Sequence, residues 1–143
     1  MLVLKLIKEN GVEPYEGPVR YVKAVRDAGS RRAVVSSSAN CKDVLVAAGI
    51  NDLFETVVDG KTVDAQQLKG KPAPDTFLAG AKALSVQPAQ AVVFEDALAG
   101  VQAGRAGHFG FVVGVDRVGQ ADALKEHGAD IVVKDLAELL DTP

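Results

Sequence analysis

Five short runs of β-branched and aromatic residues recur along the chain, and they constrain its fold more than any other feature. The runs are mostly continuous rather than alternating between polar and apolar residues, which is typical of strands covered on both faces. Segments with helical spacing lie between them. This alternation predicts an α/β fold with a mostly parallel sheet and helices on both faces. The runs lie near residues 32–37, 54–59, 91–95, 109–116 and 130–134.

The segments between these runs carry helix start and stop signals. The segment 18–29 places three valines on one side and ends at Gly29, which suits a C-cap. The segment that begins at Asn40 ends in the same way at Gly49. The stretch 59–74 has no helical stripe, so we expect a long loop, with or without a short hairpin. Further helices are predicted over 74–84, 96–107, 120–128 and 136–141.

Composition and charge narrow the class of protein. A chain of 143 residues predicts one domain with a sizeable core. The net charge of -3 and the lack of a basic stripe argue against a nucleic-acid partner. The single cysteine, Cys41, excludes an internal disulfide and a cysteine-based zinc site. The apolar runs are too short for a membrane span, and the first residues do not resemble a signal peptide, so we expect a cytoplasmic protein.

Polar residues follow several of the predicted strands, where ligands bind in open parallel sheets. The first such group is "SSSAN", which contains Ser36, Ser37, Ser38 and Asn40 and runs from a strand into a helix. Hydroxyls and free N–H groups at a helix N-terminus favour an anion such as phosphate. A plain N-cap with a polar turn explains the same residues equally well.

The second group is "KGKPAPD", residues 69–75. Lys71 directly precedes a proline, so it is held in an extended or turn conformation, and a helix is expected to begin near Pro74. An ammonium group presented in this way suits a phosphate. The alternative is a solvated loop lysine, which describes Lys69 better than Lys71.

The third group is the pair Glu95 and Asp96, which ends the apolar run "AVVF". Two carboxylates at the end of a buried strand are costly unless a cation compensates them. Mg²⁺ prefers a few carboxylates together with water and phosphate oxygens. The alternative is that Asp96 is only the N-cap of the next helix and that Glu95 is solvated.

Together, these three groups resemble the haloacid dehalogenase (HAD) superfamily, and most closely its β-phosphoglucomutase-like branch. The resemblance covers nearly the whole chain, and its most specific part is K-P-A-P-D followed by the E-D pair. It implies a Rossmann-like core that transfers phosphoryl groups with Mg²⁺. The implied catalytic residues are Ser36 and Lys71, and Glu95 and Asp96 are the implied metal ligands. The implied phosphate-binding residues are Ser36, Ser37, Ser38, Asn40 and Lys71.

The family's first motif, D-x-D-x-T, is the part of the pattern that these residues lack, since no D-x-D occurs among them. Its first Asp is the family's nucleophile. We therefore expect residues 1–16 to be a remnant of the cap or linker helix and residues 17–143 to be a partial core. The strand that carries this motif is central in the family. We expect this strand to be missing, and the gap that it leaves to be closed by direct pairing of its two neighbours or by exchange with a second copy.

Three functions are compatible with this pattern. The first is the C-terminal part of a Mg²⁺-dependent sugar-phosphate phosphatase or phosphomutase, inactive alone because the Asp nucleophile is absent. The second is a module that binds a phosphorylated metabolite without turnover, within a larger, trehalose-related protein. The third is a phosphorylation-receiver domain, against which the order of serine, lysine and acid pair argues. The expected partner is a small phosphorylated metabolite, with self-association through unpaired central strands.

Overall fold

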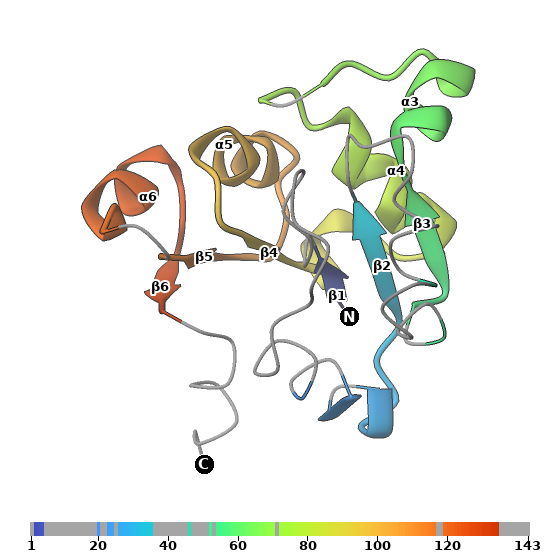
Figure 1. Cartoon of the computed structure of the whole chain (residues 1–143), viewed down its shortest axis with the longest axis horizontal. Coiled ribbons are helices and arrows are strands. Elements are labelled where there is room, and N and C mark those ends of the chain that lie inside the picture. Colours follow the sequence, from blue (N-terminus) through green and yellow to red (C-terminus); the bar gives the residue numbers. More distant parts are fainter. Residues whose placement is uncertain are drawn as a thin grey trace.

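The fold is an α/β sheet in which every observed strand pairing is parallel. The computed structural model describes residues 2–4, 20, 23–24, 26–35, 46, 52, 54–70, 72–116 and 119–134. The strands form one sheet in the order β3-β2-β1-β4-β5-β6 (Figure 1). The predicted class is therefore confirmed, and all five predicted strands are present. The strands are β1 (Leu2–Leu4), β2 (Arg32–Val35), β3 (Thr56–Val58), β4 (Val92–Glu95), β5 (Phe111–Val115) and β6 (Ile131–Val133).

The centre of the sheet corrects one expectation, because the chain's own first residues fill it. Strand β1 lies between β2 and β4, and Leu4 aligns with Val34 on one side and with Phe94 on the other. The central strand is therefore present, and its two neighbours do not pair directly. The physical reason is that an empty slot would leave the backbone N–H and C=O groups of two buried strands without partners.

Strand β1 also bears on the predicted cap remnant over residues 1–16 and on the predicted self-association. Leu2–Leu4 belongs to the core sheet and not to a remnant of the cap, while residues 5–16 lie outside the described part of the chain. Within the described residues, β2 and β4 are each paired on both sides. The unpaired central edges that motivated the prediction of self-association are therefore not observed in this part of the molecule.

The helices pack on the sheet in chain order. Helices α4 (Asp75–Ala83), α5 (Leu98–Ala106) and α6 (Ala121–His127) lie side by side across one face (Figure 1). A short 3-10 helix, η2 (Pro88–Gln90), precedes β4. The described residues of the predicted helix 18–29 are helical up to Asp27, and Gly29 has a left-handed φ of 88°. Of the predicted helix 40–49 only Val46 is described, and it is helical, while 136–141 lies outside the described residues.

The stretch 59–74, predicted to be a loop, contains the helix α3 (Gly60–Gln66), so that prediction is wrong for most of its first half. A capping box begins this helix: Thr62 N–H donates to Asp59 Oδ1 at 3.0 Å, and Asp59 N–H donates to Thr62 Oγ1 at 3.4 Å. None of its residues is buried. A helix that buries no face leaves no apolar stripe in the sequence, and therefore only its cap could have indicated it.

Replacing Asp59 with alanine is expected to lower the free energy of unfolding by about 1 kcal/mol, because the first turn of α3 loses its acceptor. Asp59 is 2% exposed, so water cannot easily take its place. Asp64→Ala is the matched control, since Asp64 is exposed on the same helix. Urea denaturation of the two variants measures the difference, and equal stabilities would show that the capping box contributes nothing.

The core lies between the sheet and the row of helices. Side chains alternate along each strand, so that Val93 of β4 faces the helices whereas Phe94 faces the opposite side. Both are buried, which explains why the strands read as continuous apolar runs. Phe77 of α4 meets Phe109 edge to face, with ring centroids 6.1 Å apart. Within the described residues, no helix is long and apolar enough to cross a membrane.

Candidate functional site

The candidate site lies at the carboxyl ends of the neighbouring strands β4 and β5. Glu95, the last residue of β4, aligns with Gly114 of β5. The residues that follow the two strands therefore lie at the same edge of the sheet. Asp96 directly follows β4, and Asp116 directly follows β5. This is the edge at which open parallel sheets bind ligands.

Glu95 is fully buried, at 0% exposure. It lies two residues after Val93, so its side chain projects from the same face of the sheet, toward α5. Its Oε1 accepts hydrogen bonds from the backbone N–H groups of Asp96, at 3.0 Å, and Ala97, at 3.2 Å. The alternative of a solvated Glu95 is therefore wrong, because this carboxylate holds the turn that leads into α5.

Gly100 makes room for the Glu95 side chain. A Cβ at this position would lie 2.0 Å from Glu95 Cδ and 2.1 Å from Oε2, far inside van der Waals contact. Gly104, one turn further along α5, faces Val112 and Val93, and a Cβ there would lie 3.1 Å from Val112 Cγ2. The two glycines form the side of α5 that faces β4, so the helix packs close to the strand and encloses the carboxylate.

Asp96 has a different environment from its neighbour. Its side chain is half-buried, and α5 has Ala97 as its N-cap with no side-chain cap bond. The alternative in which Asp96 only caps α5 is therefore wrong. The backbone of Asp96 is held on both sides: its N–H donates to Glu95 Oε1, and its carbonyl accepts from Gln120 Nε2 at 2.9 Å.

Asp116 organises the loop after β5. Its Oδ1 accepts from the N–H groups of Gly119, at 2.7 Å, and Gln120, at 2.8 Å. Gly119 has a left-handed φ of 80°, which a glycine adopts without strain. In the sequence, Gln120 stands out only as the first residue of the predicted helix 120–128. A strand-end Asp followed three residues later by Gly is a turn signal that could have located this loop, but it gives no indication of the contact with Asp96.

The carboxylate oxygens of Glu95 and Asp96 are of the type that a divalent cation prefers, but the two acids have unequal roles. Mg²⁺ is held in proteins by one or two carboxylates, completed by water and phosphate oxygens. Asp96 is half-buried at the ligand edge, whereas Glu95 lies within the fold with Oε1 accepting two backbone N–H groups. Among the described residues, no group of three or more His, Cys, Asp or Glu side chains gathers around a possible ion. The described part of the chain thus offers a partial ligand set centred on Asp96.

The other predicted site residues, Ser36, Ser37, Ser38, Asn40 and Lys71, lie outside the described residues. The segment around Lys71 is described on both sides. Lys69 is exposed, and its N–H donates to Asp75 Oδ2 at 3.1 Å, which closes the turn before α4. Helix α4 begins at Asp75 with Pro74 as its N-cap, as the sequence predicts.

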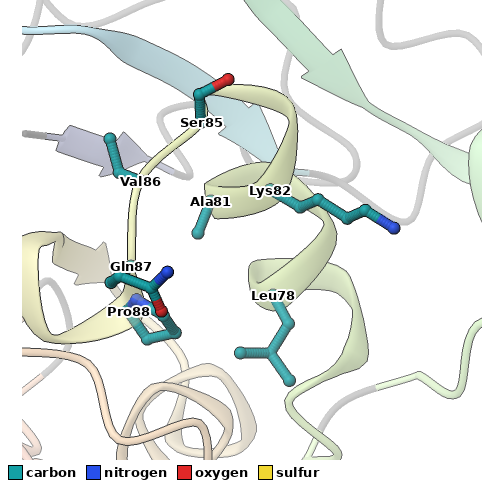
Figure 2. Close-up of a pocket in the computed structure, with 7 residues that line it drawn as sticks. All are labelled: Leu78, Ala81, Lys82, Ser85, Val86, Gln87 and Pro88. Carbon is teal, nitrogen blue, oxygen red and sulfur yellow. The ribbon is translucent and has the colours of Figure 1, made fainter.

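A hollow of about 450 Å³ lies between the last turns of α4 and the segment leading into η2 (Figure 2). Because η2 directly precedes β4, this hollow is at the amino ends of the strands, away from Asp96. Its one charged lining residue, Lys82, extends away from the hollow. The hollow therefore lacks the charges that a phosphate needs. It is lined by Leu78, Ala81, Lys82, Ser85, Val86, Gln87 and Pro88.

A parallel sheet with helices across it and acids at the carboxyl ends of its middle strands defines a Rossmann-like α/β protein. The model of the haloacid dehalogenase-like hydrolase family matches residues 3–108, well over half of the chain. The chain belongs to this family, and its similarities place it in the β-phosphoglucomutase-like branch. The resemblance inferred from the motifs is thereby confirmed.

Individual relatives agree with this assignment. The chain is 52% identical over 139 residues to the β-phosphoglucomutase of Mycobacterium tuberculosis, covering 95% of this chain and 53% of that protein. It is 36% identical over 131 residues to the trehalose-phosphate phosphatase of Mycobacterium leprae, covering 89% of this chain and 29% of that protein. The crystal structure of β-phosphoglucomutase from Clostridium difficile matches with a TM-score of 0.76 at 31% identity, covering 93% of this chain and 54% of that chain. The chain thus spans about half the length of the β-phosphoglucomutases it matches.

Proposed function

We propose that this chain forms the C-terminal, cation- and phosphate-binding part of a Mg²⁺-dependent phosphoryl-transfer enzyme that acts on a sugar phosphate. The main support is the turn from Glu95 through Ala97. Its backbone is held by hydrogen bonds, and it presents Asp96 at the ligand edge of the sheet. The sugar-phosphate class is supported by relatives named β-phosphoglucomutase and trehalose-phosphate phosphatase.

In this proposal, each acid of the pair has its own role. Asp96 would hold the cation, and Glu95 would keep the β4–α5 turn rigid through its two backbone hydrogen bonds. Bound Mg²⁺ supplies positive charge that balances the transferring phosphoryl group. Lys71 would add a second positive charge, and Ser36 with the N–H of Ser37 would orient the phosphoryl oxygens. Ser38 and Asn40 would bind a second phosphate of the substrate.

The residues that would catalyse turnover in the family, a D-x-D pair, have no counterpart in this sequence. The 143 residues contain no D-x-D pair, which supplies the nucleophile and the general acid/base in the family. The place of the central strand is taken by Leu2–Leu4, whose residues carry no acid. We therefore propose that these 143 residues alone bind Mg²⁺ weakly and do not catalyse phosphoryl transfer.

Asp96→Asn is expected to weaken Mg²⁺ binding by about tenfold or more, because the neutral amide is a poor ligand for a hard cation. Amide shifts in a ¹H–¹⁵N NMR titration with MgCl₂ measure the affinity, and Asp122→Asn, an exposed acid on α6, is the matched control. Assays with p-nitrophenyl phosphate and MgCl₂ are expected to show no turnover. Saturable hydrolysis by the pure chain would contradict the inactivity, and a wild-type chain without any Mg²⁺ response at Asp96 would contradict the proposed site.

A second function, a module that binds a phosphorylated metabolite without turnover, has one observation in its favour. The sheet is complete in its middle strands without any D-x-D segment, so the fold does not depend on the part that would carry the chemistry. Calorimetric titration of the chain with glucose 6-phosphate and trehalose 6-phosphate tests this function. Saturable binding without hydrolysis would favour the module, whereas the absence of binding to either sugar phosphate would argue against it.

A further inference from the structure

Gln120 makes a long-range contact with the proposed metal ligand. Its side-chain amide Nε2 donates to the carbonyl oxygen of Asp96 at 2.9 Å, across 24 positions of sequence. Gln120 is also the N-cap of α6, but it makes no side-chain cap bond to that helix. Its amide is therefore directed toward the β4–α5 turn and not toward its own helix.

The loop that carries Gln120 is itself fixed. Asp116 Oδ1 accepts from both Gly119 N–H and Gln120 N–H, and it follows directly on the buried end of β5. The Cα of Gln120 is thereby tied to the rigid sheet. Because this backbone is already fixed, only the side-chain torsions of Gln120 have to be ordered for its amide to hold a second backbone in place.

These contacts fix the backbone of Asp96. Its peptide N–H is bound by Glu95 Oε1 and its carbonyl by Gln120 Nε2, so the backbone from which its carboxylate projects is held from both sides. Groups that orient a metal ligand without touching the metal contribute strongly to metal affinity.

We infer that Gln120 is a positioning residue for Asp96, which sets the direction of the carboxylate toward a divalent cation. The inference depends on the proposed function, since it assigns Gln120 a role in the same cation site. Gln120 would not touch the cation, and its influence would pass through the Asp96 backbone.

Gln120→Met tests this role, because methionine keeps the length of the side chain and removes the amide. The full chain is titrated with MgCl₂ alone and followed by ¹H–¹⁵N NMR, and its thermal midpoint is recorded in parallel. The dissociation constant for Mg²⁺ is expected to rise about tenfold. Gln102→Met, the same change at an exposed position of α5, is the control and should leave the affinity unchanged.

Gln120→Asn separates positioning from a purely structural role. Asparagine is a favoured N-cap, so α6 should be at least as stable, yet the shorter side chain withdraws the amide from the Asp96 carbonyl. We expect weaker Mg²⁺ binding with an unchanged or higher thermal midpoint. This combination would not arise if Gln120 only joined α6 to the turn.

The outcomes are distinguishable. If wild-type chain binds Mg²⁺ at Asp96 and both Gln120 variants bind it equally well, the positioning role is refuted while the proposed function stands. If the variants lose affinity only in proportion to a fall in the thermal midpoint, the contact is structural and the inference is also refuted. If the wild-type chain shows no saturable response to Mg²⁺, the proposed function fails, and the role of Gln120 fails with it.

Discussion

Replacing Glu95 with alanine is expected to lower the free energy of unfolding by about 3 kcal/mol, because two backbone N–H groups lose a charged acceptor. The carboxylate is 0% exposed, and Oε1 accepts from Asp96 N–H and Ala97 N–H. Truncation also leaves a cavity beneath α5, which adds to the cost. Urea denaturation with circular dichroism measures the change.

Two further variants make this result specific. Glu95→Gln keeps the shape and one carbonyl oxygen that can accept both N–H groups, so it should retain most of the stability lost in Glu95→Ala. Glu126→Ala removes an exposed carboxylate of α6 and should be nearly neutral. If Glu95→Ala were as stable as the wild-type chain, Glu95 would not hold the turn.

Gly100→Ala is expected to destabilise the fold by about 3 kcal/mol, since overpacking of a closed core forces side chains or the helix to move. The new Cβ would meet Cγ and Cδ of Glu95 at 2.0 Å. Alanine is the better helix former, so without this overlap the substitution would stabilise α5 by up to about 1 kcal/mol. Gly70→Ala is the control, because a Cβ at Gly70 has no heavy atom within 4 Å.

A double-mutant cycle identifies the atoms responsible. In the Glu95→Ala background the Glu95 side chain that obstructs the new Cβ is gone, so Gly100→Ala should change from destabilising to neutral or stabilising. A penalty of equal size in both backgrounds would mean that α5 is displaced by another contact. Chemical denaturation of the four proteins completes the cycle.

The different environments of Glu95 and Asp96 explain how two adjacent acids are accommodated at the end of β4. Successive residues of a strand point to opposite sides, so Glu95 projects under α5 while Asp96 begins the turn beyond the strand. Glu95 Oε1 accepts the N–H groups of Asp96 and Ala97 just before the first turn of α5, where the positive end of the helix dipole favours an acceptor oxygen. One acid therefore stabilises the fold, and the other remains at the ligand edge.

The sequence was informative wherever a structure depends on neighbouring residues. Continuous apolar runs located strands β2 to β6, and helical spacing located α4, α5 and α6. The K-P-A-P-D and E-D motifs indicated the family that the comparisons confirm. The loop predicted over 59–74 failed because α3 buries no side chain, so its sequence lacks the apolar periodicity on which such a prediction depends.

What the sequence alone determined is the fold class, the family and the pair of acids at the end of β4, because propensity, periodicity and motif spacing are local properties of the chain. Only the tertiary structure decided that Leu2–Leu4 fills the centre of the sheet, that Glu95 is enclosed by Gly100, and that Gln120 reaches Asp96. These depend on strand order and on contacts between residues far apart in the chain. Pairing of buried backbone groups and close packing select them, and neither leaves a periodic signal in the sequence.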